Sequence, residues 1–207
     1  MKHTVKVLGL ALAAVFALSA IVASAASATT TFTAESEAKL TVSANETQVF
    51  TYTAGGAQIK CTGFAVDNAQ IVASSTEIEF TPTYTGCTGP GGITTHITMS
   101  GPCTITVKAD STVYFCRRGG KITFTVTGLC TYHLTTQQTG SVSYDNIGSG
   151  TTREIKVTPS VTGIATTNTN PGFLCGPESS TTGTLSGSFT LTGENSAGTA
   201  HIGITTD

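Results

Sequence analysis

The sequence contains no tryptophan and very few charged residues. Among its 207 residues are 10 Lys or Arg and 12 Asp or Glu, which gives a formal net charge of −2. Proteins that bind nucleic acid need a basic surface that displaces counterions from the phosphates. This chain has too little positive charge for such a surface, so we expect no nucleic-acid partner.

Motifs for metal binding and nucleophilic catalysis are also missing. No C-x-x-C pair is present, and no histidine stands at the spacing that zinc sites use. The G-x-S-x-G turn that carries a catalytic serine is absent too. His96, His133 and His201 each stand alone on a strand-like segment, where an exposed histidine is the simplest interpretation. We therefore predict no metal ion, no cofactor and no catalytic residue.

No segment after residue 28 has the 3.6-residue apolar period of an amphipathic helix. Apolar and polar residues alternate instead in many short segments, with turn residues about every 8–12 positions. Threonine, which suits a pleated surface, is the commonest residue with 43 copies, and the 6 prolines are too few for a Pro-rich disordered chain. This pattern predicts an all-β fold: an antiparallel β-sandwich of about a dozen short strands, stapled by disulfides.

Residues 1–28 have the features of a secretory signal peptide. A basic start precedes an apolar run over residues 7–22, and Ala26, Ser27 and Ala28 supply an A-x-A cleavage site. An uncleaved membrane anchor is the alternative, but no stop-transfer charges follow the run. We predict that residues 29–207 form a single all-β secreted domain, with no integral membrane segment after cleavage. Loss of the two leader lysines leaves this domain with a net charge of −4.

Six cysteines in an exported chain predict three disulfides, for which fifteen pairings exist. Cys103 and Cys116 are equally distant from a turn at residues 109–110, so we expect them to face each other across a hairpin. Sequential pairing of the other four then suggests two further disulfides, Cys61–Cys87 and Cys130–Cys175. Cys175 is expected to tie down a long loop within residues 166–183.

Gly119 and Gly120 separate two alternating segments and predict a two-residue hairpin turn, because such turns require positive φ. Arg117, Arg118 and Lys121 make the tip of this predicted hairpin basic. These three residues are candidates for contact with a phosphate or an acidic wall polymer. An ordinary solvated turn is the alternative.

Glu77 and Glu79 point the same way on one predicted strand, about 7 Å apart. Paired carboxylates near that distance serve glycoside hydrolysis, so a secreted polysaccharide hydrolase is the alternative function. Two neighbours on one strand flank a sugar poorly, however, and a solvated strand face is the simpler interpretation. Recurrent T-x-T pairs such as Thr123/Thr125 raise a third option, adsorption to ice or to another flat surface.

Seven segments, most of them around cysteines, have a familiar order: IKCTGF, YTGCTG, GPCTITV, GLCTYHL, GSGTTREIKVTPSVTGI, GFLCG and GSFTLTGEN. Together they resemble a group of small secreted β-proteins of soil actinobacteria, rich in threonine and glycine. The resemblance implies export, a disulfide framework and an all-β fold. It implies no activity and transfers no site residue, and VYFCRRGGK is more basic here than the resemblance leads us to expect.

Taken together, the sequence predicts a secreted, non-catalytic protein that has a binding or structural role outside the cell. The sequence does not identify the ligand. A cell-wall polymer or carbohydrate is one candidate partner, and association with the cell envelope is one candidate location outside the cell. The predicted fold class rests on the alternation of apolar and polar residues in many segments. The predicted function rests on the absence of motifs for catalysis, metal binding and nucleic-acid binding.

Overall fold

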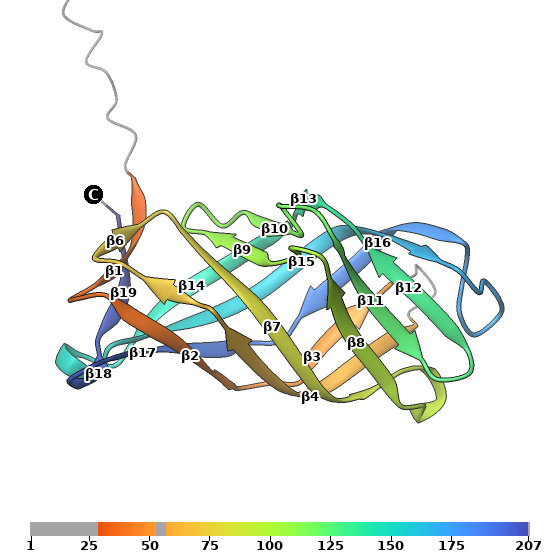
Figure 1. Ribbon diagram of the computed structural model, residues 1–207, viewed down its shortest axis with the longest axis horizontal. Helices are drawn as coiled ribbons and strands as arrows, with labels where there is room; N and C mark the ends of the chain where they lie inside the picture. Colours follow the sequence, from red (N-terminus) through yellow and green to blue (C-terminus); the bar gives the residue numbers. More distant parts are fainter. Residues whose placement is uncertain (1–28, 53–56, 207) are drawn as a thin grey trace, which may run out of the picture.

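The computed structural model describes residues 29–52 and 57–206, so the predicted leader lies outside the described residues (Figure 1). In chain order, the strands are β1 (Thr30–Ala34), β2 (Ala38–Ala44), β3 (Gln48–Thr51), β4 (Gln58–Asp67), β5 (Gln70–Ile71), β6 (Ser74–Ser75), β7 (Glu77–Thr88), β8 (Thr95–Ser100), β9 (Ile105–Lys108), β10 (Val113–Phe115), β11 (Lys121–Val126), β12 (Cys130–Leu134), β13 (Gln137–Thr139), β14 (Ser141–Ile147), β15 (Glu154–Asn168), β16 (Ser179–Ser186), β17 (Phe189–Asn195), β18 (Gly198–Ala200) and β19 (Ile202–Thr206). Two short 3₁₀ helices are η1 (Pro90–Gly92) and η2 (Gly150–Thr152).

The strands form two hydrogen-bonded sheets. One is a continuous network of 16 strands, and the other is a three-stranded sheet in the order β19-β1-β6. The main path through the network is β13-β10-β9-β7-β4-β3-β16-β15-β12-β11-β8. All strand pairs are antiparallel. The predicted antiparallel all-β fold is confirmed.

The strands are more numerous and less uniform than the dozen short ones expected. The described residues contain 19 strands, and β4, β7 and β15 are 10, 12 and 15 residues long. Such long strands change partners along their length: residues 77–80 of β7 pair with β9, and residues 81–88 pair with β4. The sequence does not indicate where β7 changes its partner strand, because apolar and polar residues continue to alternate through that point.

The network folds over itself around one apolar core. Phe50 in β3 and Phe124 in β11 are separated by three strands on the main path, yet their ring centroids are 5.1 Å apart. Phe64 in β4 and Phe189 in β17 make a similar contact at 4.9 Å. The buried side chains of these strands belong to one cluster. In β3, β4 and β11 alternation places one side of the strand in the core and leaves the other side to the surface, whereas the first three residues of β17 are all buried.

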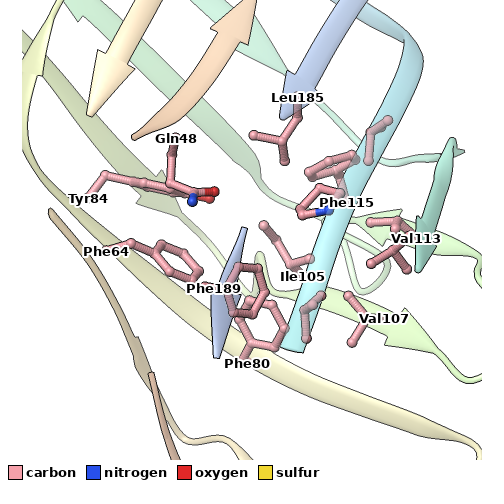
Figure 2. A pocket seen from close by; sticks show the side chains of 14 residues that line it. Gln48, Phe64, Phe80, Tyr84, Ile105, Val107, Val113, Phe115, Leu185 and Phe189 are labelled. Atoms are coloured by element: carbon pink, nitrogen blue, oxygen red, sulfur yellow. The ribbon is translucent and has the colours of Figure 1, made fainter. Parts of the chain in front are cut away.

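The core contains a small cavity of about 30 Å³ (Figure 2). Its lining is apolar except for the side chains of Gln48, which is buried, and Tyr84. A space of this size holds about one water molecule, whereas small-molecule sites usually occupy about 300 Å³ or more. This cavity is too small for a ligand, so a ligand-sized site has to lie at the surface.

The hairpin predicted at Gly119-Gly120 is wrong. Both glycines have positive φ, 101° and 82°, as predicted. However, β10 before them pairs with β9 and β13, while β11 after them pairs with β12 and β8. Cys116, itself at φ 49°, follows directly after β10, and a turn in which the Gly119 amide donates to the Cys116 carbonyl redirects the chain. The positive φ of the two glycines was thus predicted correctly, but pairing with strands distant in the sequence decides which strands lie beside β10 and β11.

Candidate functional site

The three disulfides join the cysteines that sequence analysis paired. They are Cys61–Cys87, Cys103–Cys116 and Cys130–Cys175, which span 26, 13 and 45 residues. No free cysteine remains among the described residues. The disulfides therefore act as structural crosslinks, and they leave no thiol there for nucleophilic chemistry.

The Cys103–Cys116 hairpin differs from the prediction in one detail. Phe115 pairs with Ile105 and Val113 with Val107, so the register is shifted by one residue and Cys103 is not directly opposite Cys116. The Cys116 amide instead donates a hydrogen bond to the Thr104 carbonyl at 2.8 Å. The connecting turn holds three residues rather than two, which accounts for the shift. The left-handed backbone of Cys116 accompanies a Cα–Cα distance of 4.1 Å between the two cysteines.

The structure brings together two groups of residues that the sequence presented as separate candidates. Arg117 Nη1 lies 2.8 Å from Glu77 Oε2, and Arg118 Nη2 lies 2.8 Å from Glu79 Oε2. The hydroxyl of Thr104 donates to the second oxygen of Glu79, also at 2.8 Å. Each carboxylate is therefore engaged by an arginine, and each arginine by a carboxylate.

This pairing bears on both functional interpretations of these residues. A glycosidase needs two carboxyl groups that flank the sugar bond, but Glu77 and Glu79 lie on one strand beneath the arginines. The arginines in turn have carboxylate partners at hydrogen-bond distance. Lys121, the third predicted contact residue, lies elsewhere, at the exposed start of β11 opposite Ser100 of β8.

We expect the double variant Glu77→Gln, Glu79→Gln to fold normally. The two ion pairs are partly exposed, and exposed pairs stabilise proteins by about 0–1 kcal/mol each. Urea denaturation should therefore show a loss of less than about 2 kcal/mol in the free energy of unfolding. A polysaccharide-hydrolysing activity of the wild type that the double variant loses would contradict our interpretation of this cluster.

A different surface feature stands out at the loop between β15 and β16, residues 169–178. Phe173 at its tip is fully exposed, at 102% of its reference area, and Leu174 is 51% exposed. The only other large apolar side chain that is exposed in the described residues is Val72, at 54%. Phe173 and Leu174 are adjacent and form a small apolar patch, and exposed apolar patches with a polar rim often mark interaction sites.

The base of this loop is held firmly. Cys175 is bonded to Cys130 of β12, and its carbonyl oxygen accepts hydrogen bonds from the Tyr132 hydroxyl at 2.8 Å and the Asn168 amide at 3.0 Å. Both donor side chains are buried. Burial also raises the pKa of the Tyr132 hydroxyl well above its ordinary value, so this group remains a proton donor. Cys175 is thus anchored to β12 by its disulfide, and its backbone carbonyl is held by the two buried side chains Tyr132 and Asn168.

The tip of the loop is closed by its own backbone. The Gly172 amide donates to the Gly176 carbonyl at 3.1 Å, and the Gly176 amide donates back to Gly172 at 2.7 Å. The Cys175 amide also donates to the Gly172 carbonyl, at 3.0 Å. Phe173 and Leu174 lie inside this closed turn. A ring presented by a turn of this kind loses little conformational entropy when it binds.

Phe173 and Leu174 border a surface groove of about 520 Å³. The rest of the groove comes from the start of β4 and the segment after β7: Ala57, Gln58, Lys60, Thr88, Gly89, Pro90 and Gly92. An amide, an ammonium group and a hydroxyl thus stand beside an aromatic and an aliphatic side chain. This combination can pack against an apolar surface and hydrogen-bond to polar groups on the same ligand. We call this surface the Phe173 groove.

Phe173 and Leu174 were not among the contact residues predicted from the sequence. They lie in the expected long loop beside Cys175, and apolar residues next to a disulfide usually belong to the core. Their position between Pro171-Gly172 and Gly176, in a segment where apolar and polar residues do not alternate, was the one feature of the sequence that could have drawn attention to them. That signal indicates a turn but not which side of the turn faces the solvent.

Other classes of site are not found in the part of the chain that the structure describes. No cluster of three or more His, Cys, Asp or Glu side chains there could hold a metal ion. Across residues 29–52 and 57–206, no helix has the length and apolarity needed to span a bilayer.

Comparison with known proteins adds no relative. The chain matches no protein-family model, no curated protein and no solved structure. The candidate site therefore rests on the geometry of this chain alone.

Proposed function

We propose that this protein is a secreted, non-catalytic binding protein that holds a cell-envelope polysaccharide in the Phe173 groove. The observation that carries the proposal is the fully exposed ring of Phe173 on a disulfide-anchored turn beside a polar groove. Sugars present an apolar face of C–H groups and a rim of hydroxyls. An aromatic ring packs on the first, and amide, hydroxyl and ammonium groups hydrogen-bond to the second.

Several observations support export and the absence of catalysis. Three disulfides are typical of an oxidising compartment outside the cytosol, in line with the signal-peptide pattern and with the resemblance to secreted actinobacterial β-proteins. The arginine partners of Glu77 and Glu79 favour a structural role for that pair over a hydrolytic one. A binding protein needs only an exposed complementary surface, which the Phe173 groove supplies.

The test is co-sedimentation of the oxidised mature protein with isolated envelopes of its own host. Wild-type protein should pellet saturably, and Phe173→Ala should weaken binding about 30-fold. This factor corresponds to about 2 kcal/mol, the usual threshold for a central aromatic contact. Because the ring is fully exposed, its removal should leave the melting temperature unchanged.

Val72→Ala is the matched control. It removes an exposed apolar side chain outside the groove and should bind envelopes as the wild type does. Equal loss in both variants would indicate unspecific hydrophobic adhesion and would overturn the proposal. Wild-type protein that stays in the supernatant would overturn it as well.

A further inference from the structure

A second surface, separate from the Phe173 groove, lies on the outward side of β8, β11 and β12. Positions that point inward on these strands are buried or half-buried, and nearly all are apolar. The positions that point outward carry only side chains with hydrogen-bonding groups. We call them the hydroxyl face: His96, Thr98, Ser100, Lys121, Thr123, Thr125, Thr131 and His133.

The three strands pair so that these outward side chains stand in rows across the sheet. The two full rows are Thr98-Thr123-His133 and His96-Thr125-Thr131. Neighbouring strands lie about 4.8 Å apart, so each row is a closely spaced series of donors and acceptors. Within the first row, Thr123 Oγ1 already lies 3.1 Å from His133 Nδ1. An extended ligand that crosses the strands would meet several polar groups in succession.

The hydroxyl face has positive charge and no negative charge. Strands β8, β11 and β12 contain no Asp or Glu, although the chain has 12. Lys121 is exposed at the start of β11. Burial, and then repulsion by Lys121, lower the pKa of His133, so this imidazole is mainly neutral at neutral pH and acts as a hydrogen-bonding group.

The Phe173 groove has the same charge pattern. Lys60 lines it, and none of its lining residues is acidic. A protein whose acidic residues outnumber its basic ones thus has two polar surfaces from which negative charge is missing. With Lys60 in one surface and Lys121 in the other, charge complementarity favours an anionic partner over a cationic one.

Adsorption to ice explains this face less well. That option requires a regular ladder of T-x-T pairs, but half of the positions in the hydroxyl face are occupied by His, Lys or Ser. The Lys121 ammonium group adds a charge, and imidazole and ammonium groups both differ in length and shape from the threonine side chain. The mixture suits a ligand that itself mixes hydroxyl and anionic groups.

We propose that the hydroxyl face binds an acidic polysaccharide, a chain that carries carboxylate or phosphate groups among its hydroxyls. Threonine hydroxyls and imidazoles hydrogen-bond to the sugar hydroxyls, and Lys121 forms a charge-assisted hydrogen bond to an anionic group. This inference rests on the proposed function, because it names the class of the bound polymer. It uses residues other than those of the Phe173 groove, so the two can fail separately.

The test measures binding of the oxidised mature protein to three soluble polymers by biolayer interferometry. Polygalacturonate supplies carboxylates, poly(glycerol phosphate) supplies phosphates, and dextran supplies neutral sugars. At least one anionic polymer should bind, with an affinity that falls as salt is added, and dextran should bind at least about tenfold more weakly. The better anionic polymer identifies the anionic group.

Two exposed positions are changed so that folding is preserved. Thr98→Glu and Lys121→Gln should each weaken binding of the anionic polymer at least about fivefold. Ser186→Glu adds the same charge at an exposed strand position outside the face and should bind as the wild type does. Circular dichroism should show the same spectrum for all three variants.

The outcomes separate this inference from the proposed function. Wild-type affinity in both Thr98→Glu and Lys121→Gln would overturn the role of the hydroxyl face, and dextran binding as tight as that of the anionic polymers would overturn the choice of an acidic ligand. If Phe173→Ala alone weakens binding, the proposed function stands and this inference fails. If the face variants weaken binding and Phe173→Ala does not, this inference stands and the groove loses its role.

Discussion

Reduction of the three disulfides is expected to unfold the protein at room temperature. On the loop-entropy model, crosslinks that span 13, 26 and 45 residues stabilise by about 3, 3.5 and 4 kcal/mol. Their sum is about 10 kcal/mol, as large as the whole free energy of unfolding of a typical domain. The chain has no tryptophan to strengthen its core, so we expect little stability to remain.

The measurement is a far-ultraviolet circular dichroism spectrum with a thermal melt, before and after reduction and alkylation. Oxidised protein carried through the same treatment without reductant is the control. The reduced protein should lose both the β-sheet spectrum and the cooperative transition. If it keeps both, the network of strand pairs is stable without its crosslinks and this prediction is wrong.

Removal of one disulfide at a time should show a graded effect. The Cys130→Ala, Cys175→Ala variant should lose the most stability because its loop is the longest. It should also release the turn that presents Phe173, so binding to envelopes should weaken even at temperatures where the protein stays folded. The Cys103→Ala, Cys116→Ala variant, with the shortest loop, should lose less stability and keep its binding.

The substitution Gly120→Ala is expected to destabilise the protein by about 3 kcal/mol or more. Gly120 has φ 82°, a conformation that costs an alanine about 1–2 kcal/mol. In addition, a Cβ at this position would lie 2.2 Å from the Ser100 carbonyl oxygen and 3.1 Å from the Cβ of Cys103. Relief of such an overlap requires a backbone shift, which usually costs about 1–3 kcal/mol.

Gly119→Ala is the matched control for this substitution. Gly119 also has positive φ, 101°, but a Cβ there would have no neighbour within 4 Å. Gly119→Ala should lower the free energy of unfolding only by the cost of the positive φ, about 1–2 kcal/mol. Urea denaturation of the two variants measures the difference. Equal losses would mean that the approach of Gly120 to Ser100 is not close enough to matter.

Particular residues show how far the sequence could be interpreted. Alternation in segments such as residues 77–80 identified the strands, because a strand with one buried side repeats every two residues whatever its partner is. Cys103 and Cys116 were paired correctly because a short hairpin keeps equally distant residues close, and a one-residue error in register did not separate them. These inferences needed only local geometry.

The sequence was less informative wherever strand pairing over long distances decided the result. Gly119-Gly120 has the chemistry of a hairpin turn, but the strand that follows pairs with β8, because register with β8 and β12 buries its apolar side. Arg117 and Arg118 meet Glu77 and Glu79 across about 40 residues of sequence. Neither segment alone contains a pattern that predicts these ion pairs.

The sequence by itself determined the all-β class, the Cys103–Cys116 disulfide and the polar, weakly charged composition of the chain, whereas it only suggested the pairing of the other four cysteines. Periodicity and residue chemistry are properties of short segments, so they can be recognised without knowing which segments meet. Only the tertiary structure decided that Phe173 faces solvent beside Lys60, and that polar positions of three strands align as the hydroxyl face. Both surfaces arise from the register and the folding-over of the network, which depend on the summed packing of the whole core.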